Sequence, residues 1–178
     1  MKKYTCSHPK YNVKDLITRP WETGIRNFRH VAEYFMYYAH NIDCVHSRGK
    51  IEGSEADKIL QEMIRAANMQ DKYKYVKSPK SETWNEFALN GDVICMQCSR
   101  MTCQINKRED ELTSLLRHIR NAFAHGRIYI KRNKKGKEDY IMLEDLDKSK
   151  KLSARIVTTF KNLETWKAKL EGTIAKGE

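Results

Sequence analysis

Apolar residues along this chain recur mostly at intervals of three and four, the spacing of one face of an α-helix. The pattern predicts five helices, at residues of about 21–46, 54–68, 81–106, 109–125 and 146–171. Ser54 suits an N-cap at the start of the second helix. Gly126 suits the end of the fourth, because glycine accepts the left-handed conformation found there. We therefore expect a chain dominated by helices.

The spacing at which apolar residues recur changes after the fourth helix, at residues of about 127–144. Ile128 and Ile130 alternate with polar neighbours, a turn-forming stretch follows at 133–136, and a second apolar run begins at Tyr140. Alternation on both sides of a turn is typical of a β-hairpin. The sequence predicts a mainly α-helical bundle in a single domain, residues 1–178, with one small hairpin after the fourth helix.

Size and hydropathy limit the class of protein. A chain of 178 residues with 40% hydrophobic content suits one domain with one core. No stretch approaches the roughly 20 uninterrupted apolar residues of a membrane helix, and the N-terminus has no apolar run of the signal-peptide kind. We expect a soluble, cytoplasmic protein that does not bind membranes.

Charge favours a polyanionic partner. The 34 Lys and Arg residues against 23 Asp and Glu give a net charge of +11 and a pI near 9.4. Such a field attracts nucleic acid more than small acidic metabolites, although charge alone does not identify the partner.

The fourth predicted helix separates an apolar face from a face that carries chemistry. On a helical wheel of about 100° per residue, Arg117, Asn121 and His125 stack opposite the core, with Arg120 on one shoulder and His118 on the other. The core arc consists of Leu112, Leu115, Leu116, Ile119 and Phe123.

These side chains match the needs of RNA cleavage by the neighbouring 2'-hydroxyl. That reaction requires groups that move protons, which imidazole can do near neutral pH. It also requires a cation to stabilise charge on phosphorus, and guanidinium offers several rigid donors. Asn121 can fix the tautomer of His125 or hold the phosphate. One such His per chain is too few for acid and base, so we expect a two-fold homodimer.

The string Arg120-Asn121-x-x-x-His125, within LLRHIRNAFAHG, resembles the Arg-x4-6-His motif of HEPN ribonucleases. The predicted order of a long first helix, a late motif helix, a hairpin and a closing helix is similar to small prokaryotic HEPN proteins of toxin and defence systems. The resemblance implies that Arg120 and His125 are catalytic and that Asn121 assists them. It also implies a composite dimer site that uses no metal or other cofactor, and a bacterial toxin or anti-phage setting.

Basic residues around the motif are candidates for RNA binding. A charged hairpin tip can grip the RNA backbone, because phosphate contacts give affinity without sequence choice. A solvated turn is the alternative. The candidates are Arg117, Lys131, Arg132, Lys134, Lys135 and Lys137.

The cysteines are expected to be structural. Five cysteines in a chain of this size do not suggest disulfides. Cys95 and Cys98 have the spacing of a zinc-binding pair, but no second pair or matched His follows them and the stretch is predicted to be helical. We therefore expect Cys95, Cys98 and Cys103 to be buried structural thiols, and we expect no metal site.

Plainer roles remain open for the motif. His125 and Asn121 can instead cap the helix end. The chain can also be a non-catalytic RNA-binding module, or a partner of an antitoxin or another defence protein.

Overall fold

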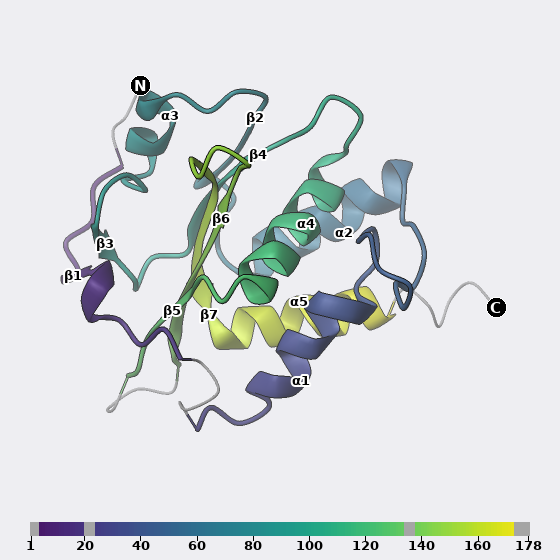
Figure 1. Ribbon diagram of the computed structural model, residues 1–178, viewed down its shortest axis with the longest axis horizontal. Helices are drawn as coiled ribbons and strands as arrows, with labels where there is room; N and C mark the ends of the chain where they lie inside the picture. Colours follow the sequence, from purple (N-terminus) through teal and green to yellow (C-terminus); the bar gives the residue numbers. More distant parts are fainter. Residues whose placement is uncertain (1–3, 20–23, 134–137, 173–178) are drawn as a thin grey trace.

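A five-stranded β-sheet runs through the middle of the protein (Figure 1). The computed structural model describes residues 4–19, 24–133 and 138–172. The strand order is β2-β4-β7-β6-β5, and only β2 and β4 are parallel. The strands are β2 (Tyr73–Val76), β4 (Arg100–Gln104), β5 (Ile128–Lys131), β6 (Tyr140–Leu146) and β7 (Leu152–Thr159).

Helices cover one face of this sheet, to its right in Figure 1. Side chains from the helices and from the facing side of the strands form the larger core, which includes Phe35, Met63, Leu115 and Trp166. The helical layer contains α1 (Phe28–Glu33), the π-helical turn η3 (Tyr34–Tyr38), α2 (Gly53–Ala66), α4 (Glu111–Ala124) and α5 (Phe160–Gly172).

A smaller layer covers the other face, to the left of the sheet in Figure 1. Here β1 pairs antiparallel with β3 in a separate two-stranded sheet. Trp84, Phe87 and Ile94 pack with Met142 and Val157 of the central strands in a second core. The layer contains β1 (Lys10–Asn12), the 3₁₀ turn η1 (Val13–Asp15), α3 (Ser81–Glu86) and β3 (Val93–Cys95).

The prediction of a mainly α-helical bundle is therefore wrong, because the described fold is mixed α/β. Only Ser81–Glu86 of the range 81–106 is helical, and the rest supplies β3 and β4. The range 146–171 divides into β7 and α5. Strand β7 is buried along almost its whole length, with layers on both sides. A strand of that kind has no alternation of polar residues, so period alone does not distinguish it from helix.

Other elements follow the sequence more closely. Helices α2 and α4 lie within the predicted ranges 54–68 and 109–125, apart from the first residue of α2. Strands β5 and β6 pair as the predicted hairpin, which the larger sheet then extends. The first helix is shorter than its predicted range of 21–46, since regular helix begins at Phe28 and the π-helical turn ends at Tyr38.

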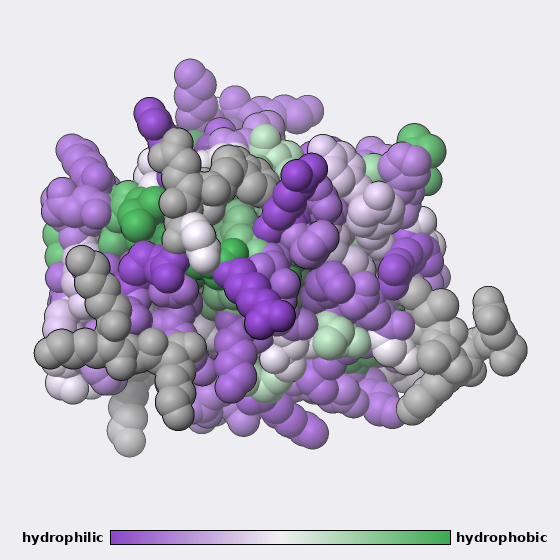
Figure 2. Space-filling model, turned by 90° about the horizontal axis from the view of Figure 1, so that it is seen from below, coloured by the Kyte–Doolittle hydropathy of each residue, from purple (hydrophilic) through white to green (hydrophobic). Residues whose placement is uncertain are grey.

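One face of the molecule is largely polar. Figure 2 shows that hydrophilic side chains predominate on one face and that apolar ones form small separate patches. Among the described residues, no helix combines the length and apolar composition needed to cross a membrane.

Candidate active site on helix α4

Helix α4 begins and ends where the sequence indicates. The Asp110 carboxylate accepts the N–H of Thr113 at 2.7 Å, as an N-cap does. At the other end Gly126 has φ +64°, the left-handed conformation that terminates helices. The five apolar residues of the predicted core arc are all buried. The face that they leave carries the residues of the motif.

A buried carboxylate from β6, Asp145, lies beneath the polar face of α4. Its Oδ2 is 2.8 Å from His118 Nδ1 and accepts a hydrogen bond from Asn121 Nδ2 at 3.0 Å. The guanidinium groups of Arg117 and Arg127 are 4.0 and 3.9 Å away. Burial alone would raise the pKa of Asp145, but the hydrogen bonds from His118 and Asn121 and the nearby cations lower it. The group is therefore an anion that anchors α4 to the sheet.

His118 belongs to this buried cluster, and its predicted place on an exposed shoulder of the helix is wrong. Its side chain has no exposed surface. Its Nε2 lies 2.7 Å from the carbonyl oxygen of Gln104, so each ring nitrogen faces an oxygen of the protein. The imidazole fixes β4, α4 and β6 to one another and is not available to RNA.

Asn121 connects the cluster to Arg120. While its amide nitrogen donates to Asp145, its side-chain oxygen accepts a hydrogen bond from Arg120 Nη1 at 3.3 Å. Of the two roles considered for Asn121, a hydrogen bond from its side chain to the His125 imidazole is not formed, whereas holding the phosphate stays a prediction. Instead, the amide side chain is fixed at both ends and orients the half-buried guanidinium of Arg120.

His125 lies at the exposed C-terminal end of α4. Its backbone N–H donates to the Asn121 carbonyl oxygen at 2.9 Å, as a C-cap residue does. The imidazole forms no hydrogen bond or ion pair with any residue in the described ranges. The imidazole is therefore exposed at the same helix end as Arg120 and Asn121.

A pocket of about 390 Å³ opens next to these residues. Its wall includes Arg117, which forms a two-pronged ion pair with Glu109 at 2.7 and 2.9 Å. Burial opposes the charge of Arg117, but the Glu109 carboxylate raises its pKa. His125 does not line the pocket. The lining residues are Asn41, Ile42, Asp43, Glu109, Arg117, Arg120 and Asn121.

Sequence reasoning missed Asp145 and Glu109. Asp145 comes from a strand 24 residues beyond Asn121, and its role depends on the pairing of β6 with its neighbours. Only one signal in the sequence marks it: Glu144 and Asp145 interrupt an otherwise apolar strand. Both prove to be buried.

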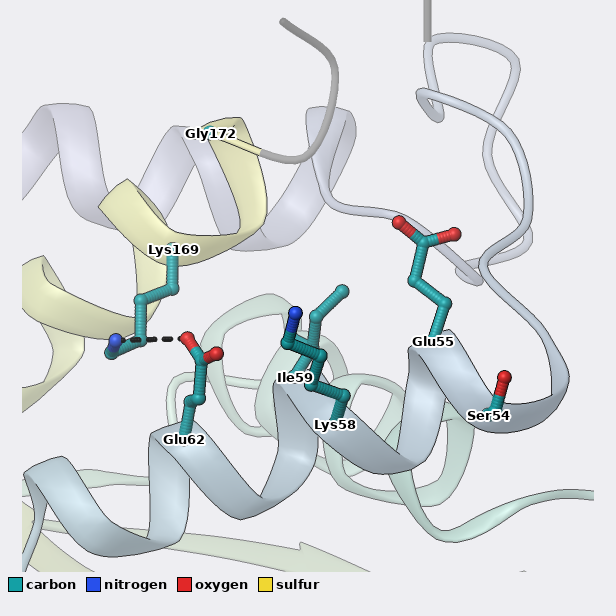
Figure 3. Close-up of a pocket in the computed structure, with 7 residues that line it drawn as sticks. All are labelled: Ser54, Glu55, Lys58, Ile59, Glu62, Lys169 and Gly172. Atoms are coloured by element: carbon teal, nitrogen blue, oxygen red, sulfur yellow. Dashed lines mark hydrogen bonds and ion pairs between the residues drawn. The ribbon is translucent and has the colours of Figure 1, made fainter. Parts of the chain in front are cut away.

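A second pocket, of about 450 Å³, lies between α2 and α5 (Figure 3). Lys169 of α5 forms an ion pair with Glu62 of α2 across it at 3.1 Å. Ser54, Glu55 and Lys58 complete its polar lining, and it contains no motif residue. Exposed, compensated charges of this kind are ordinary at a helix–helix boundary.

The hairpin is only partly described. Lys131 lies over the Tyr11 ring, with its Nζ 4.5 Å from the centroid, and Arg132 pairs with Asp139 at 3.0 Å. These contacts hold both side chains against the protein. Three of the predicted RNA-binding residues lie outside the described ranges: Lys134, Lys135 and Lys137.

The family comparison agrees with the motif. The model of a family described as HEPN pEK499 p136 matches residues 50–176, well over half of the chain and the whole of α4. The chain belongs to this HEPN family. The predicted resemblance is thus confirmed, although the helical-bundle architecture expected with it is not. Comparisons with curated proteins and with solved structures returned no match.

Membership associates this HEPN chain with nuclease or other RNA-related function in general. Among the described residues, one group of three cysteines and one histidine has the spacing of a metal site, and it lies in the smaller layer. The chemistry available at the exposed end of α4 is that of imidazole and guanidinium.

Proposed function

We propose that this HEPN protein is an endoribonuclease that cleaves RNA by attack of a 2'-hydroxyl on the adjacent phosphate. The products are a 2',3'-cyclic phosphate and a 5'-hydroxyl. One observation carries the proposal: Arg120 is oriented through Asn121 by a buried carboxylate, while His125 projects an exposed imidazole from the same helix end. A supported cation beside an exposed imidazole is what the reaction needs.

Each residue has a separate role. His125 transfers a proton, either from the 2'-hydroxyl or to the leaving 5'-oxygen. Arg120 stabilises the charge that develops on the phosphate oxygens. Asn121 positions Arg120, since its side chain bonds to that guanidinium and to Asp145. Imidazole and guanidinium together supply proton transfer and charge stabilisation, so we propose a reaction that continues without a divalent metal ion.

The active form is a homodimer with a composite site. His125 is five positions after Arg120, so on a helix the two side chains point in directions about 140° apart and are displaced by about 7.5 Å along the axis. A second motif related by two-fold symmetry can bring an Arg and a second imidazole to face the first. Light scattering should give twice the chain mass of 21.0 kDa. A monomer at micromolar concentration, with and without RNA, would contradict the composite site.

The experiment that tests the activity uses the full chain, total RNA and an excess of EDTA. We expect cleavage to continue, and the fragments to become labelled by polynucleotide kinase at their 5'-hydroxyl ends without prior phosphatase. If the protein binds a range of RNA substrates but cleaves none of them, the alternative is favoured: a non-catalytic RNA-binding or partner-binding HEPN module.

The proposed biological setting rests on the resemblance of the motif. The motif is similar to that of small prokaryotic HEPN proteins of toxin and defence systems, which supports a cytoplasmic toxin or anti-phage effector. In such a setting an antitoxin or defence partner controls the nuclease. Co-purification of the tagged chain with the product of a neighbouring gene, and inhibition by it, would test this part of the proposal.

A further inference from the structure

Three cysteines and a histidine converge in the smaller layer, on the opposite side of the sheet from α4 (Figure 1). Cys6 Sγ lies 3.3 Å from both Cys95 Sγ and Cys98 Sγ. His8 Nδ1 lies 3.3 Å from the sulfur atoms of Cys6 and Cys98. All four ligand atoms lie within 4.8 Å of one another.

Strand pairing brings these residues together from distant parts of the chain. Cys6 and His8 directly precede β1, whereas Cys95 ends β3 and Cys98 lies in the turn before β4. Because β1 pairs with β3, with Lys10 opposite Cys95, the two short motifs meet. The helical prediction for this stretch is wrong, because Cys95 ends β3 and Cys98 lies in the turn that follows. No second pair follows the Cys-x-x-Cys motif, but Cys6 and His8, which come from before it in the sequence, lie beside it.

The backbone around the sulfur atoms suits thiolates. The N–H of His8 donates to Cys6 Sγ at 3.4 Å, and the N–H of Gln97 donates to Cys95 Sγ. In each case the donor is two residues after the cysteine. Hydrogen bonds donated to sulfur stabilise its anionic form, which is the form that binds a metal.

The neighbouring Arg100 gives a second, independent indication. Its side chain is fully buried, and it donates to the carbonyl oxygens of Cys95 at 2.9 Å and Cys98 at 2.7 Å. No carboxylate partner for it occurs among the described residues. A buried cation of this kind requires a compensating anion. Three thiolates, one neutral imidazole and one divalent ion together carry a charge of about −1.

We propose that Cys6, His8, Cys95 and Cys98 bind one Zn²⁺ ion in a tetrahedral, structural site. Zinc–sulfur bonds of about 2.3 Å give sulfur–sulfur edges of about 3.8 Å in a tetrahedron, so the 3.3 Å distances from Cys6 to its two partners need to lengthen by only about 0.5 Å. A disulfide requires about 2.05 Å between two chosen sulfur atoms, whereas Cys6 lies equally far from two partners. Binding releases the thiol protons and ties the N-terminal segment to β3.

The family match does not supply this site. It begins at residue 50, so Cys6 and His8 lie outside it. The site is also separate from the motif on α4, and its test does not depend on RNA cleavage. Loss of zinc and loss of nuclease activity are therefore distinguishable results.

The first experiment measures metal in the full wild-type chain, purified under reducing conditions and without chelator. We expect about one zinc per chain by inductively coupled plasma mass spectrometry. Exchange with Co²⁺ should give the visible absorption of a tetrahedral thiolate complex. Folded, reduced protein with far less than one zinc and no cobalt spectrum would refute the site. So would an intrachain disulfide that joins Cys6 to Cys95 or Cys98, or stoichiometric iron.

Matched variants assign the ligands. Cys98→Ser and His8→Ala should lose most of the zinc, whereas His8→Cys should retain it, because zinc accepts four thiolates. Cys44→Ser is the control, since Cys44 is a half-buried cysteine outside the cluster. Equal zinc content in Cys98→Ser and Cys44→Ser would contradict the assignment. Wild-type measurements decide the question if a ligand variant does not fold.

Discussion

Two histidines on the same helix have opposite environments. His118 is buried, and oxygen atoms of Asp145 and Gln104 lie beside its two ring nitrogens. His125, two helical turns further on, is exposed and its imidazole has no partner among the described residues. The comparison shows that polar residues in the middle of α4 stabilise the fold, whereas those at its C-terminal end remain exposed and available for chemistry.

The arginines of α4 show the same division. Arg117 is committed to a two-pronged ion pair with Glu109 and also donates to the carbonyl oxygen of Gln104. Arg120 makes one hydrogen bond among the described residues, of 3.3 Å to the Asn121 side chain. A phosphate can therefore engage Arg120 without breaking an ion pair, whereas Arg117 would have to give up its carboxylate partner.

Apart from the loss of His125, the largest expected effect is that of replacing Arg120. Arg120→Ala should lower the single-turnover cleavage rate about 100- to 1,000-fold, as the loss of one preorganised charge-stabilising donor does. Arg120→Lys should recover only part of the rate, because an ammonium lacks the planar fork of donors. Melting temperature and dimerisation should stay close to wild type. Full activity in Arg120→Ala would assign the chemistry to another cation.

The next effect concerns stability. Asp145→Ala removes the anion of a buried cluster and leaves His118 and Arg127 without it. Breaking such a pair typically costs about 3 to 5 kcal/mol of unfolding free energy, which urea titration can measure. The control is Asp43→Ala, an exposed carboxylate that lines the pocket beside Arg120, which should change stability by less than about 0.5 kcal/mol. Equal effects would contradict an anchoring role for Asp145.

Acid should weaken the same cluster. The folded-state pKa of Asp145 is below that of the unfolded chain, so its contribution to stability is complete above the unfolded value. It is lost as pH falls through the folded-state value. We expect unfolding free energy to fall more steeply below about pH 4 in wild type than in Asp145→Asn, which has no carboxyl group there. Parallel acid profiles would show that Asp145 is not held as a stabilising anion.

The smallest effect is on RNA affinity at the hairpin. Replacing Lys134, Lys135 and Lys137 by Gln should reduce the slope of log affinity against log salt by roughly 0.7 to 0.9 for each phosphate that the hairpin no longer neutralises. The control replaces three exposed lysines of the β6–β7 turn, which lies at the opposite end of β6. These are Lys148, Lys150 and Lys151. If both triple variants change the slope equally, the hairpin acts only through net charge.

Local patterns predicted α4 and its motif well, because a helix places residues three and four apart on one face. The buried arc from Leu112 to Phe123 and the exposed end at His125 are both as expected. The helical wheel also placed His118 on an exposed shoulder of α4, which is wrong. A wheel cannot show that β6 brings Asp145 to that side of the helix.

Contacts between distant segments could not be predicted from the spacing of apolar residues along the chain. Strand β7 has layers on both faces and so lacks polar alternation, although its run of Ile156, Val157, Thr158 and Thr159 is rich in β-branched residues that favour strands. The cysteine cluster depends on the pairing of β1 with β3, across about ninety residues of sequence. Composition and spacing within each segment contain no information about that pairing.

The most direct test of the account compares His125→Ala with His118→Ala in the same two assays, single-turnover RNA cleavage in EDTA and unfolding by urea. We predict that His125→Ala unfolds like wild type but cleaves about 100- to 10,000-fold more slowly, the usual cost of losing proton transfer. His118→Ala should instead lose stability and, at a temperature where it remains folded, cleave far faster than His125→Ala. Cleavage by folded His125→Ala at the wild-type rate, after contaminating nuclease is excluded, would contradict the proposed role of the motif.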